Sequence, residues 1–182
     1  YKTNMFYFTD DTFTINKQRV YELCSMLIND ESDFIWGCES RADVLNDENL
    51  VIALANSGCR KMQIGLESGD NDILQKLRKH ITIEEVERAI QLTTKHGISV
   101  QISYILGHAF DTKETILKTI NFVKYLEKEY GVIGTCSINT PFPGTEQYIK
   151  AEEYGMKIYA QSWDEYKFDN AIISTKDLST DD

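Results

Sequence analysis

Polar and ionisable side chains follow five apolar, strand-like runs of the sequence. They are Thr9-Asp10-Asp11, Glu39-Ser40-Arg41, Glu67-Ser68-Gly69, Gly107-His108 and Asn139-Thr140-Pro141. Because the carboxyl ends of parallel strands meet at one edge of a sheet, we expect these groups to converge on one rim. Carboxylates beside a guanidinium suit the binding of a small polar ligand.

Other interpretations of these residues stay open. Acids after strands often cap the following helix, and this explains Asp11 and Asp111 about as well as ligand binding does. A hydrolase that holds a divalent metal is a second enzyme class, because carboxylates and imidazole are suitable ligands. Its ligands would be Asp10, Glu39, Glu67 and His108. A binding module without catalytic activity is the third alternative.

The elements that position these residues alternate along the chain. The strand-like runs are Met5-Phe8, Phe34-Cys38, Met62-Leu66, Val100-Leu106 and Ile133-Ile138. Apolar residues at helical spacing and glycine stops predict helices at Lys17-Asn29, Asp47-Ser57, Thr82 to Gly97, Asp111 to Gly131 and Thr145-Tyr154. We expect Asn16 to cap the first helix, and we expect capping boxes at Thr82/Glu85 and Asp111/Glu114.

This alternation predicts an α/β fold with a parallel sheet covered by helices. About five βα units are present, whereas a full eight-unit barrel takes about 250 residues, so an open, partial (β/α) barrel is expected. A doubly wound sheet is the alternative, but its usual GxGxxG signature is absent. We expect residues 1–155 to form the core and residues 156–182 a C-terminal extension, as a strand or irregular cover.

Composition narrows the possible partners and location. The 19 Lys and Arg residues against 29 Asp and Glu give a net charge of −10, which disfavours nonspecific nucleic-acid binding. The sequence has neither an apolar run of membrane-spanning length nor a signal-peptide pattern, which predicts a cytoplasmic protein without a membrane partner. Cys24, Cys38, Cys59 and Cys136 have no metal-binding spacing. The chain starts close to a strand, so we expect a piece of a longer polypeptide.

Six segments in order resemble the radical S-adenosylmethionine (SAM) superfamily, most closely the branch whose longer members carry a cobalamin-binding domain. They are Phe8-Thr9-Asp10-Asp11-Thr12-Phe13, Cys38-Glu39-Ser40-Arg41-Ala42-Asp43, Ala55-Asn56-Ser57-Gly58-Cys59, Ile64-Gly65-Leu66-Glu67-Ser68-Gly69, Tyr104-Ile105-Leu106-Gly107 and Thr140-Pro141-Phe142-Pro143-Gly144-Thr145. The resemblance covers about residues 5 to 150 and implies units two to six of a six-unit partial barrel.

The resemblance also implies an activity. In the family, a [4Fe-4S] cluster held by a CxxxCxxC loop reduces SAM and splits it to methionine and a 5′-deoxyadenosyl radical. That loop is absent from this sequence. The implied cofactors are therefore SAM, a [4Fe-4S] cluster with ligands outside this chain, and cobalamin in a longer protein. A reductant such as flavodoxin or ferredoxin is the implied protein partner, and we expect the isolated chain to be inactive.

By position, the resemblance assigns SAM-binding roles and no catalytic residue. Asp10 and Asp11 would meet the SAM amino group, and Arg41 its carboxylate. Glu67 and Ser68 would contact the ribose, Ile105 would flank the adenine, and backbone groups at Asn139 would reach the adenine edge. The family's Gly-x-Pro-Gly-Glu-Thr reads Gly107-His108-Ala109-Phe110-Asp111-Thr112 here, a departure in the adenine-side loop.

The first strand-like run suggests self-association. Met5-Phe8 would lie at the edge of the sheet with large apolar side chains and unpaired backbone groups, and no proline or inward charge protects it. We expect the isolated chain to associate through this flank.

Overall fold

The computed structural model describes residues 3–30 and 33–181. The helices are α1 (Lys17–Asn29), α2 (Ala42–Leu45), α3 (Glu48–Asn56), α4 (Asn71–Lys76), α5 (Ile83–Lys95), α6 (Lys113–Tyr130) and α7 (Glu146–Ile149), with 3-10 turns η1 (Phe13–Ile15) and η2 (Trp163–Glu165). The strands are β1 (Met5–Tyr7), β2 (Ile35–Ser40), β3 (Cys59–Glu67), β4 (Ser99–Leu106), β5 (Ile133–Ile138), β6 (Lys157–Ile158) and β7 (Ile173–Ser174).

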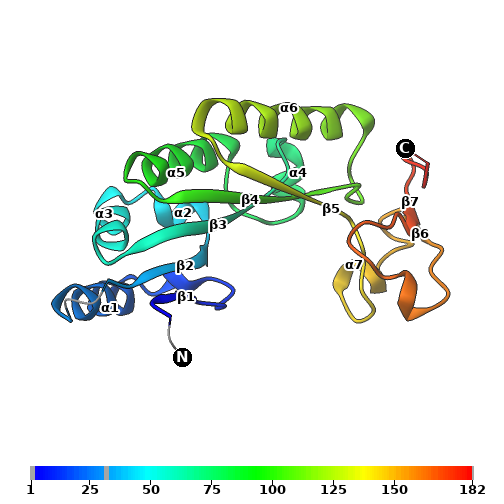
Figure 1. Cartoon of the computed structure of the whole chain (residues 1–182). Helices are drawn as coiled ribbons and strands as arrows, with labels where there is room; N and C mark the ends of the chain where they lie inside the picture. The colour runs from blue at the N-terminus through cyan, green and yellow to red at the C-terminus, as the bar shows by residue number, and fades with distance from the viewer. Residues whose placement is uncertain (1–2, 31–32, 182) are drawn as a thin grey trace. The chain divides into compact units, whose positions relative to one another are not determined.

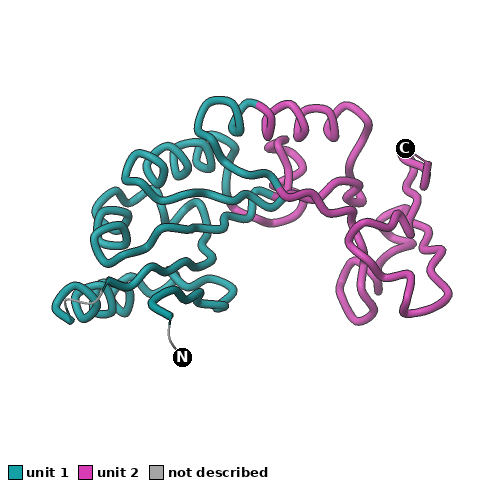
Figure 2. Tube along the Cα trace, viewed as in Figure 1, with its two compact units in different colours: residues 1–66, 81–103, 125–134 teal, residues 67–80, 104–124, 135–182 magenta. Residues whose placement is uncertain are grey.

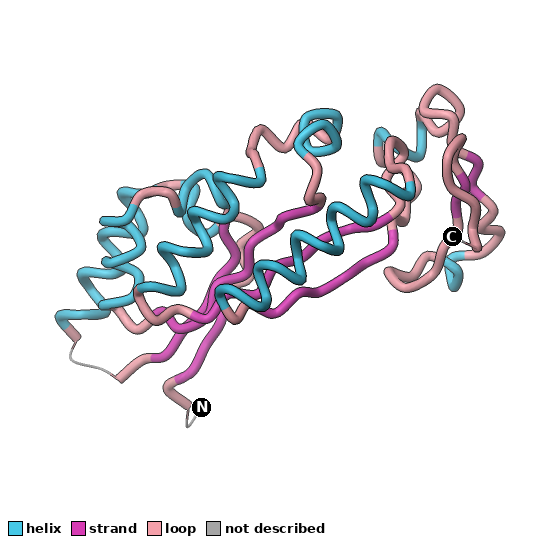
Figure 3. The backbone as a smooth tube through the Cα atoms, turned by 90° about the horizontal axis from the view of Figure 1, so that it is seen from above, coloured by secondary structure: helices cyan, strands magenta, loops and turns pink. Residues whose placement is uncertain are grey.

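The first five strands form one parallel sheet in sequence order, β1-β2-β3-β4-β5 (Figure 1). In its first two pairs, Met5 aligns with Ile35 and Trp36 with Cys59. Helices connect successive strands, as the alternation of colours along the tube in Figure 3 shows. The predicted α/β class and the partial (β/α) barrel are confirmed.

The chain divides into two compact units, coloured in Figure 2. Unit 1 contains residues 1–66, 81–103 and 125–134, and unit 2 contains residues 67–80, 104–124 and 135–182. The ends of β3 and β4 therefore belong to unit 2 although most of each strand belongs to unit 1. The expected C-terminal extension, residues 156–182, lies within unit 2.

Unit 1 holds a close-packed apolar core. In it α1 packs against α3, and α2 against α5. Trp36, Leu54, Met62 and Ile90 are fully buried between these helices and the strands. The side chain of Trp36 also donates a hydrogen bond from Nε1 to the carbonyl of Ser57 at 2.8 Å, which satisfies its one polar atom.

Local signals explain where the helices begin. Asn16 caps α1 by accepting a hydrogen bond from the N–H of Arg19, and Thr82 with Glu85 forms the predicted capping box of α5. The predicted Asp111/Glu114 box is wrong. Instead α6 begins one residue later, because Thr112 and Thr115 exchange reciprocal backbone and side-chain hydrogen bonds. The predicted helix at Thr145-Tyr154 is reduced to the four residues of α7.

The C-terminal segment lies in unit 2 and has a small core of its own. β6 and β7 pair antiparallel, and Met156, Ile172 and Ile173 pack with Ala109. Phe110 and Tyr154 lie against this cluster, with their ring centroids 5.4 Å apart. Within residues 3–30 and 33–181, no helix combines the length and the apolar character needed to cross a membrane.

Candidate functional site

The turn after β3 places a carboxylate in a strained backbone conformation. Glu67, the last residue of β3, has a φ of 65°, in the left-handed region that residues other than glycine seldom adopt. Such conformations cost about 1–3 kcal/mol and cluster at functional sites. The contacts around this turn must therefore hold it in place.

The residues after Glu67 are hydrogen-bonded to α6. The Ser68 hydroxyl lies 3.2 Å from the hydroxyl of Thr119, which also accepts a hydrogen bond from the N–H of Gly69 at 2.9 Å. Gly69 approaches α6 so closely that a Cβ there would lie 2.7 Å from the Cα of Thr119. Ser68 is fully buried and faces the helix. The structure therefore does not bring its side chain to the rim, where a ribose contact was predicted.

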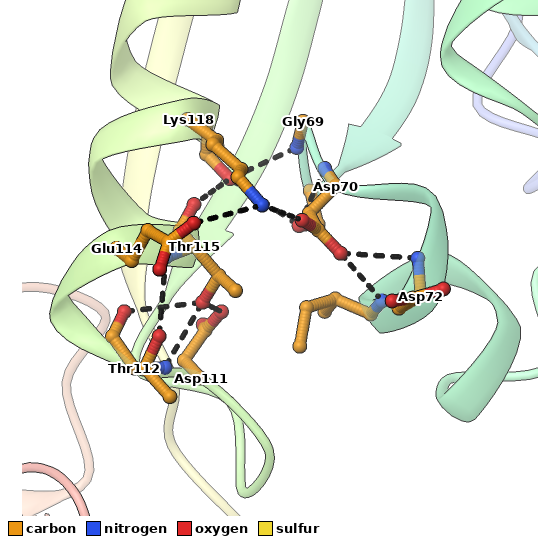
Figure 4. Close-up of polar contacts among 11 residues, drawn as sticks. Gly69, Asp70, Asp72, Asp111, Thr112, Glu114, Thr115 and Lys118 are labelled. Carbon is orange, nitrogen blue, oxygen red and sulfur yellow. Dashed lines mark hydrogen bonds and ion pairs between the residues drawn. The ribbon is translucent and has the colours of Figure 1, made fainter.

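Asp70 completes this attachment (Figure 4). One carboxylate oxygen caps α4 by accepting hydrogen bonds from the N–H groups of Asp72 and Ile73, at 3.0 and 3.2 Å. The other lies 3.1 Å from Nζ of Lys118, which also contacts Glu114. Burial raises the pKa of Asp70, but Lys118 and the helix N–H groups together lower that pKa below its usual value.

The carboxylate of Glu67 has a cation beside it. Nζ of Lys79 lies 2.7 Å from Oε1 of Glu67, and both side chains are largely removed from solvent. Lys79 follows Arg78, which also has a positive φ and contacts Glu146 on α7. The segment after α4 therefore brings two cations to this region of unit 2.

The loop after β4 contacts the same turn at Glu67 through His108. Asp111 accepts a hydrogen bond from the N–H of His108 at 2.9 Å, and its other oxygen accepts one from the hydroxyl of Thr115. The imidazole of His108 hydrogen-bonds to the backbone carbonyl of Glu67. Burial lowers the pKa of His108 more than the nearby carboxylates of Asp111 and Glu67 raise it, so the neutral ring is favoured.

A cavity of about 300 Å³ opens beside this loop in unit 2. Its walls include Ile105 from β4, Phe110 from the following loop, and Arg78. His108 and Asn139 also line it, and each has a buried side-chain nitrogen without a hydrogen-bond partner among the described residues, Nε2 and Nδ2 respectively. Buried polar groups are normally satisfied, so two such atoms on one cavity indicate a place for a ligand.

The resemblance assigned the backbone groups at Asn139 to the adenine edge, and the structure shows one of them in another hydrogen bond. Its backbone N–H donates to the carbonyl of Leu106 at 2.8 Å, so this group is already engaged. The residue lines the cavity, and its buried side-chain Nδ2 has no hydrogen-bond partner among the described residues. Ile105 and Asn139 line the same cavity, and their contacts with adenine stay a prediction.

A family model for the radical SAM superfamily matches residues 1–123 of the chain. The chain belongs to the radical SAM superfamily.

Known proteins of this superfamily match nearly the whole chain. An uncharacterized methyltransferase of Pyrococcus horikoshii is 29% identical over 96% of the chain and 37% of its own length. The anaerobic magnesium-protoporphyrin IX monomethyl ester cyclase of Rubrivivax gelatinosus is 27% identical over 92% of the chain and 29% of its own length. The chain thus spans about a third of the length of these relatives.

The fold also matches a solved radical SAM structure. The methyltransferase TsrM of Kitasatospora setae, solved with cobalamin and a [4Fe-4S] cluster bound, superposes with a TM-score of 0.72 at 19% identity. The match covers 87% of this chain and 34% of TsrM. At 19% identity, this likeness supports the fold of the chain alone.

The predicted contacts to the amino-acid end of SAM lie in unit 1. Asp10 and Asp11 are exposed after β1, and Asp10 lies 3.3 Å from a guanidinium nitrogen of Arg19. Arg41 caps α2 from its backbone and pairs with Asp43 at 3.0 Å. Asp11 caps neither η1 nor α1, whose N-caps are Thr12 and Asn16, so its capping interpretation is wrong.

The four cysteines do not provide a cluster site among the described residues. Cys24, Cys38 and Cys59 are buried, and Cys136 is exposed. In residues 3–30 and 33–181, no three His, Cys, Asp or Glu side chains are grouped so that they could hold a metal ion. An iron-sulfur cluster therefore does not fit this donor set, and the metal-hydrolase alternative has no ligand set in the described part of the chain.

Two features of this candidate site were not predicted. Lys79 was not singled out, although its position after the short helix α4 places it on Glu67. Its signal in the sequence is the basic run from Lys76 to His80, which interrupts the apolar pattern. The role of Thr119 in holding Gly69 was also missed, because an interior helix threonine gives no local sign of a distant backbone partner.

Proposed function

We propose that this chain is the SAM-binding core of a full-length radical SAM enzyme, and that unit 2 holds the nucleoside part of SAM. The observation that carries the proposal is the cavity at the ends of β4 and β5, which Ile105, His108 and Asn139 line and beside which His108 Nε2 and Asn139 Nδ2 have no hydrogen-bond partner among the described residues. The strained Glu67, whose carbonyl supports the His108 ring, supplies a carboxylate at the end of β3.

In this proposal each group binds one part of the molecule. The carboxylate of Glu67 accepts hydrogen bonds from the ribose hydroxyls, while Lys79 pairs with that carboxylate and orients it. Ile105 packs against the adenine. The contacts of Asp10 and Asp11 in unit 1 with a SAM amino group, and of Arg41 with a SAM carboxylate, stay predictions from the resemblance. The Ser68 hydroxyl, bonded to Thr119, holds the turn after β3 in this proposal.

The chemistry of the whole enzyme depends on groups outside the described residues. A [4Fe-4S] cluster, for which the described residues offer no ligand set, would supply the electron that cleaves SAM, and a reductant such as flavodoxin or ferredoxin would deliver that electron. The residues of this chain bind SAM and orient it. The methyltransferase relative and the cobalamin-bound TsrM support a cobalamin-dependent methyl transfer as the overall reaction.

Calorimetry with the full-length protein tests the assignment of Glu67. Glu67→Gln should weaken SAM binding by about 1–3 kcal/mol, or roughly 5- to 150-fold, because a hydrogen bond to a charged group is lost in a polar site. Glu152→Gln is the matched control, an exposed acid of the same unit. Unchanged SAM affinity in a folded Glu67→Gln protein would show that this carboxylate does not hold the ribose.

A further inference from the structure

Unit 2 holds another cavity, of about 120 Å³, whose walls are aliphatic. Its large side chains come from β4, α6, β5, β7 and the loop after β7, and they are Leu106, Ile116, Ile138, Ile173 and Leu178. Protein interiors contain few spaces larger than a water molecule, because a cavity lowers stability in proportion to its volume. A cavity of this size between several elements is therefore a candidate ligand site, which we call the aliphatic cavity.

The aliphatic cavity is separate from the cavity of the proposed SAM site. Successive side chains of a strand point to opposite faces of the sheet. Ile105 lines the SAM cavity, whereas Leu106, the next residue of β4, lines the aliphatic cavity. Among the described residues that line them, the two cavities have none in common. A ligand in the aliphatic cavity therefore occupies a site of its own.

The lining residues indicate an uncharged ligand with a short hydrocarbon chain. None of the described residues that line the aliphatic cavity carries a charge. Burying a charge without a partner is costly, so a charged group does not fit there. Ser179 and Thr180 line it and are exposed, so hydroxyl groups lie where the cavity meets solvent. An apolar cavity of about 150 Å³ holds one benzene molecule, so this slightly smaller cavity fits a chain of about four or five carbons.

We infer that the aliphatic cavity binds a small, uncharged molecule through an aliphatic chain of about four or five carbons, with the polar end of that molecule at Ser179 and Thr180. This site is additional to the proposed SAM site. Each CH₂ group that enters the cavity strengthens binding by about fourfold. Carbons beyond the length of the cavity stay in solvent and add little.

Three substitutions on α6 change the aliphatic cavity in known directions. Ile116→Phe enlarges a side chain of its wall and should fill part of it. Ile116→Ala shortens the same side chain and should enlarge the cavity. Leu117→Phe is the matched control, because Leu117 is the next residue of α6, is 57% exposed and does not line the cavity.

Methyl NMR of the full-length protein, labelled at the isoleucine δ1 carbons, measures binding of the 1-alkanols from 1-propanol to 1-octanol. The signals of Ile116, Ile138 and Ile173 should shift in wild type, because all three side chains line the cavity. The dissociation constant should fall about fourfold with each added CH₂ group up to about five carbons and then stay level.

The variants should change this dependence on chain length. Ile116→Phe, followed at Ile138 and Ile173, should weaken 1-pentanol binding by about tenfold or more, because the room for about two CH₂ groups is lost. Ile116→Ala should extend the fall in the dissociation constant by about two or three carbons, because the cavity is longer. Leu117→Phe should leave the whole series unchanged, as should saturating S-adenosylhomocysteine.

Three results would overturn the inference. Dissociation constants that fall evenly to 1-octanol and are the same in Ile116→Phe would show partition onto the protein surface. The absence of any shift at Ile116, Ile138 and Ile173 in wild type would show that another part of the full-length protein or solvent fills the cavity. Loss of the alkanol response at saturating S-adenosylhomocysteine would show that the cavity belongs to the SAM site, and the proposed function would then stand without the separate site.

Discussion

Replacing Asp70 tests whether the turn that carries Glu67 depends on its attachment to α4 and α6. Its carboxylate accepts two hydrogen bonds from the start of α4 and lies 3.1 Å from Lys118. Asp70→Ala removes a helix N-cap and leaves the N–H of the buried Ile73 without its partner. We expect a loss of about 1–2 kcal/mol in the free energy of unfolding.

Asp70→Asn separates the cap from the charge. Asparagine caps helices as well as aspartate does, so the two backbone hydrogen bonds remain and only the ion pair is lost. That pair contributes little, because the Lys118 side chain is 51% exposed and solvent screens it. The loss in the free energy of unfolding for Asp70→Asn should therefore be well under half of that for Asp70→Ala. Added salt should weaken the Asp70–Lys118 pair in wild type and so reduce this loss further.

Urea unfolding followed by circular dichroism measures both variants. Equal losses for Asp70→Ala and Asp70→Asn would refute the reasoning, because the charge and not the cap would then matter. The pH gives a further check. The folded pKa of Asp70 lies below its unfolded value of about 3.9, so its contribution is present above that pH and is lost as the pH falls through the folded pKa.

Three further predictions concern other parts of the chain. The folded pKa of His108 lies below the unfolded value of about 6.5, so the unfolded chain takes up the proton first. The free energy of unfolding should therefore fall as the pH drops through 6.5, by at most about 1.4 kcal/mol per pH unit. The urea midpoint of His108→Asn should fall less over the same pH range than that of wild type. Gly69→Ala should cost about 3 kcal/mol, the upper end for overpacking, because the added Cβ would lie 2.7 Å from the Cα of Thr119 on α6. Gly97→Ala, with nothing within 4 Å, should cost only the left-handed penalty of about 1–2 kcal/mol, and thermal melts that place the two variants together would contradict the predicted clash. The 182-residue chain should self-associate through β1, where Met5 is 62% exposed, and sedimentation should show that Met5→Lys reduces association; a monomeric wild type would show that this edge is protected.

Periodic patterns predicted most of the fold. The helix at Lys17–Asn29 has the predicted bounds, because its apolar stripe and the Asn16 cap are both local signals. The short helices α2 and α4 were not predicted. Each is less than two turns long, so neither can show a repeating apolar face, and α4 forms because Asp70 caps it.

The SAM contacts stay a prediction, but part of the arrangement of the candidate site could be predicted from strand positions, and the rest could not for physical reasons. Ile105 and Asn139 could be placed together, because both lie at the ends of parallel strands. Ser68 was expected beside Glu67 at the rim, but its hydroxyl is buried against Thr119 on α6. Arg78 and His80, on either side of Lys79, have positive φ angles, and this backbone conformation brings Lys79 to Glu67. Residue types alone do not reveal such a conformation.

Hydrogen exchange measured by mass spectrometry, with and without S-adenosylhomocysteine, tests the central claim that the ends of β3, β4 and β5 bind the nucleoside of SAM. In the full-length protein at saturating ligand, exchange should slow in residues 67–80, 104–112 and 138–147 and remain unchanged in the outer helix α1. Protection that is confined to other segments, with these three unaffected while the ligand is bound, would contradict the account.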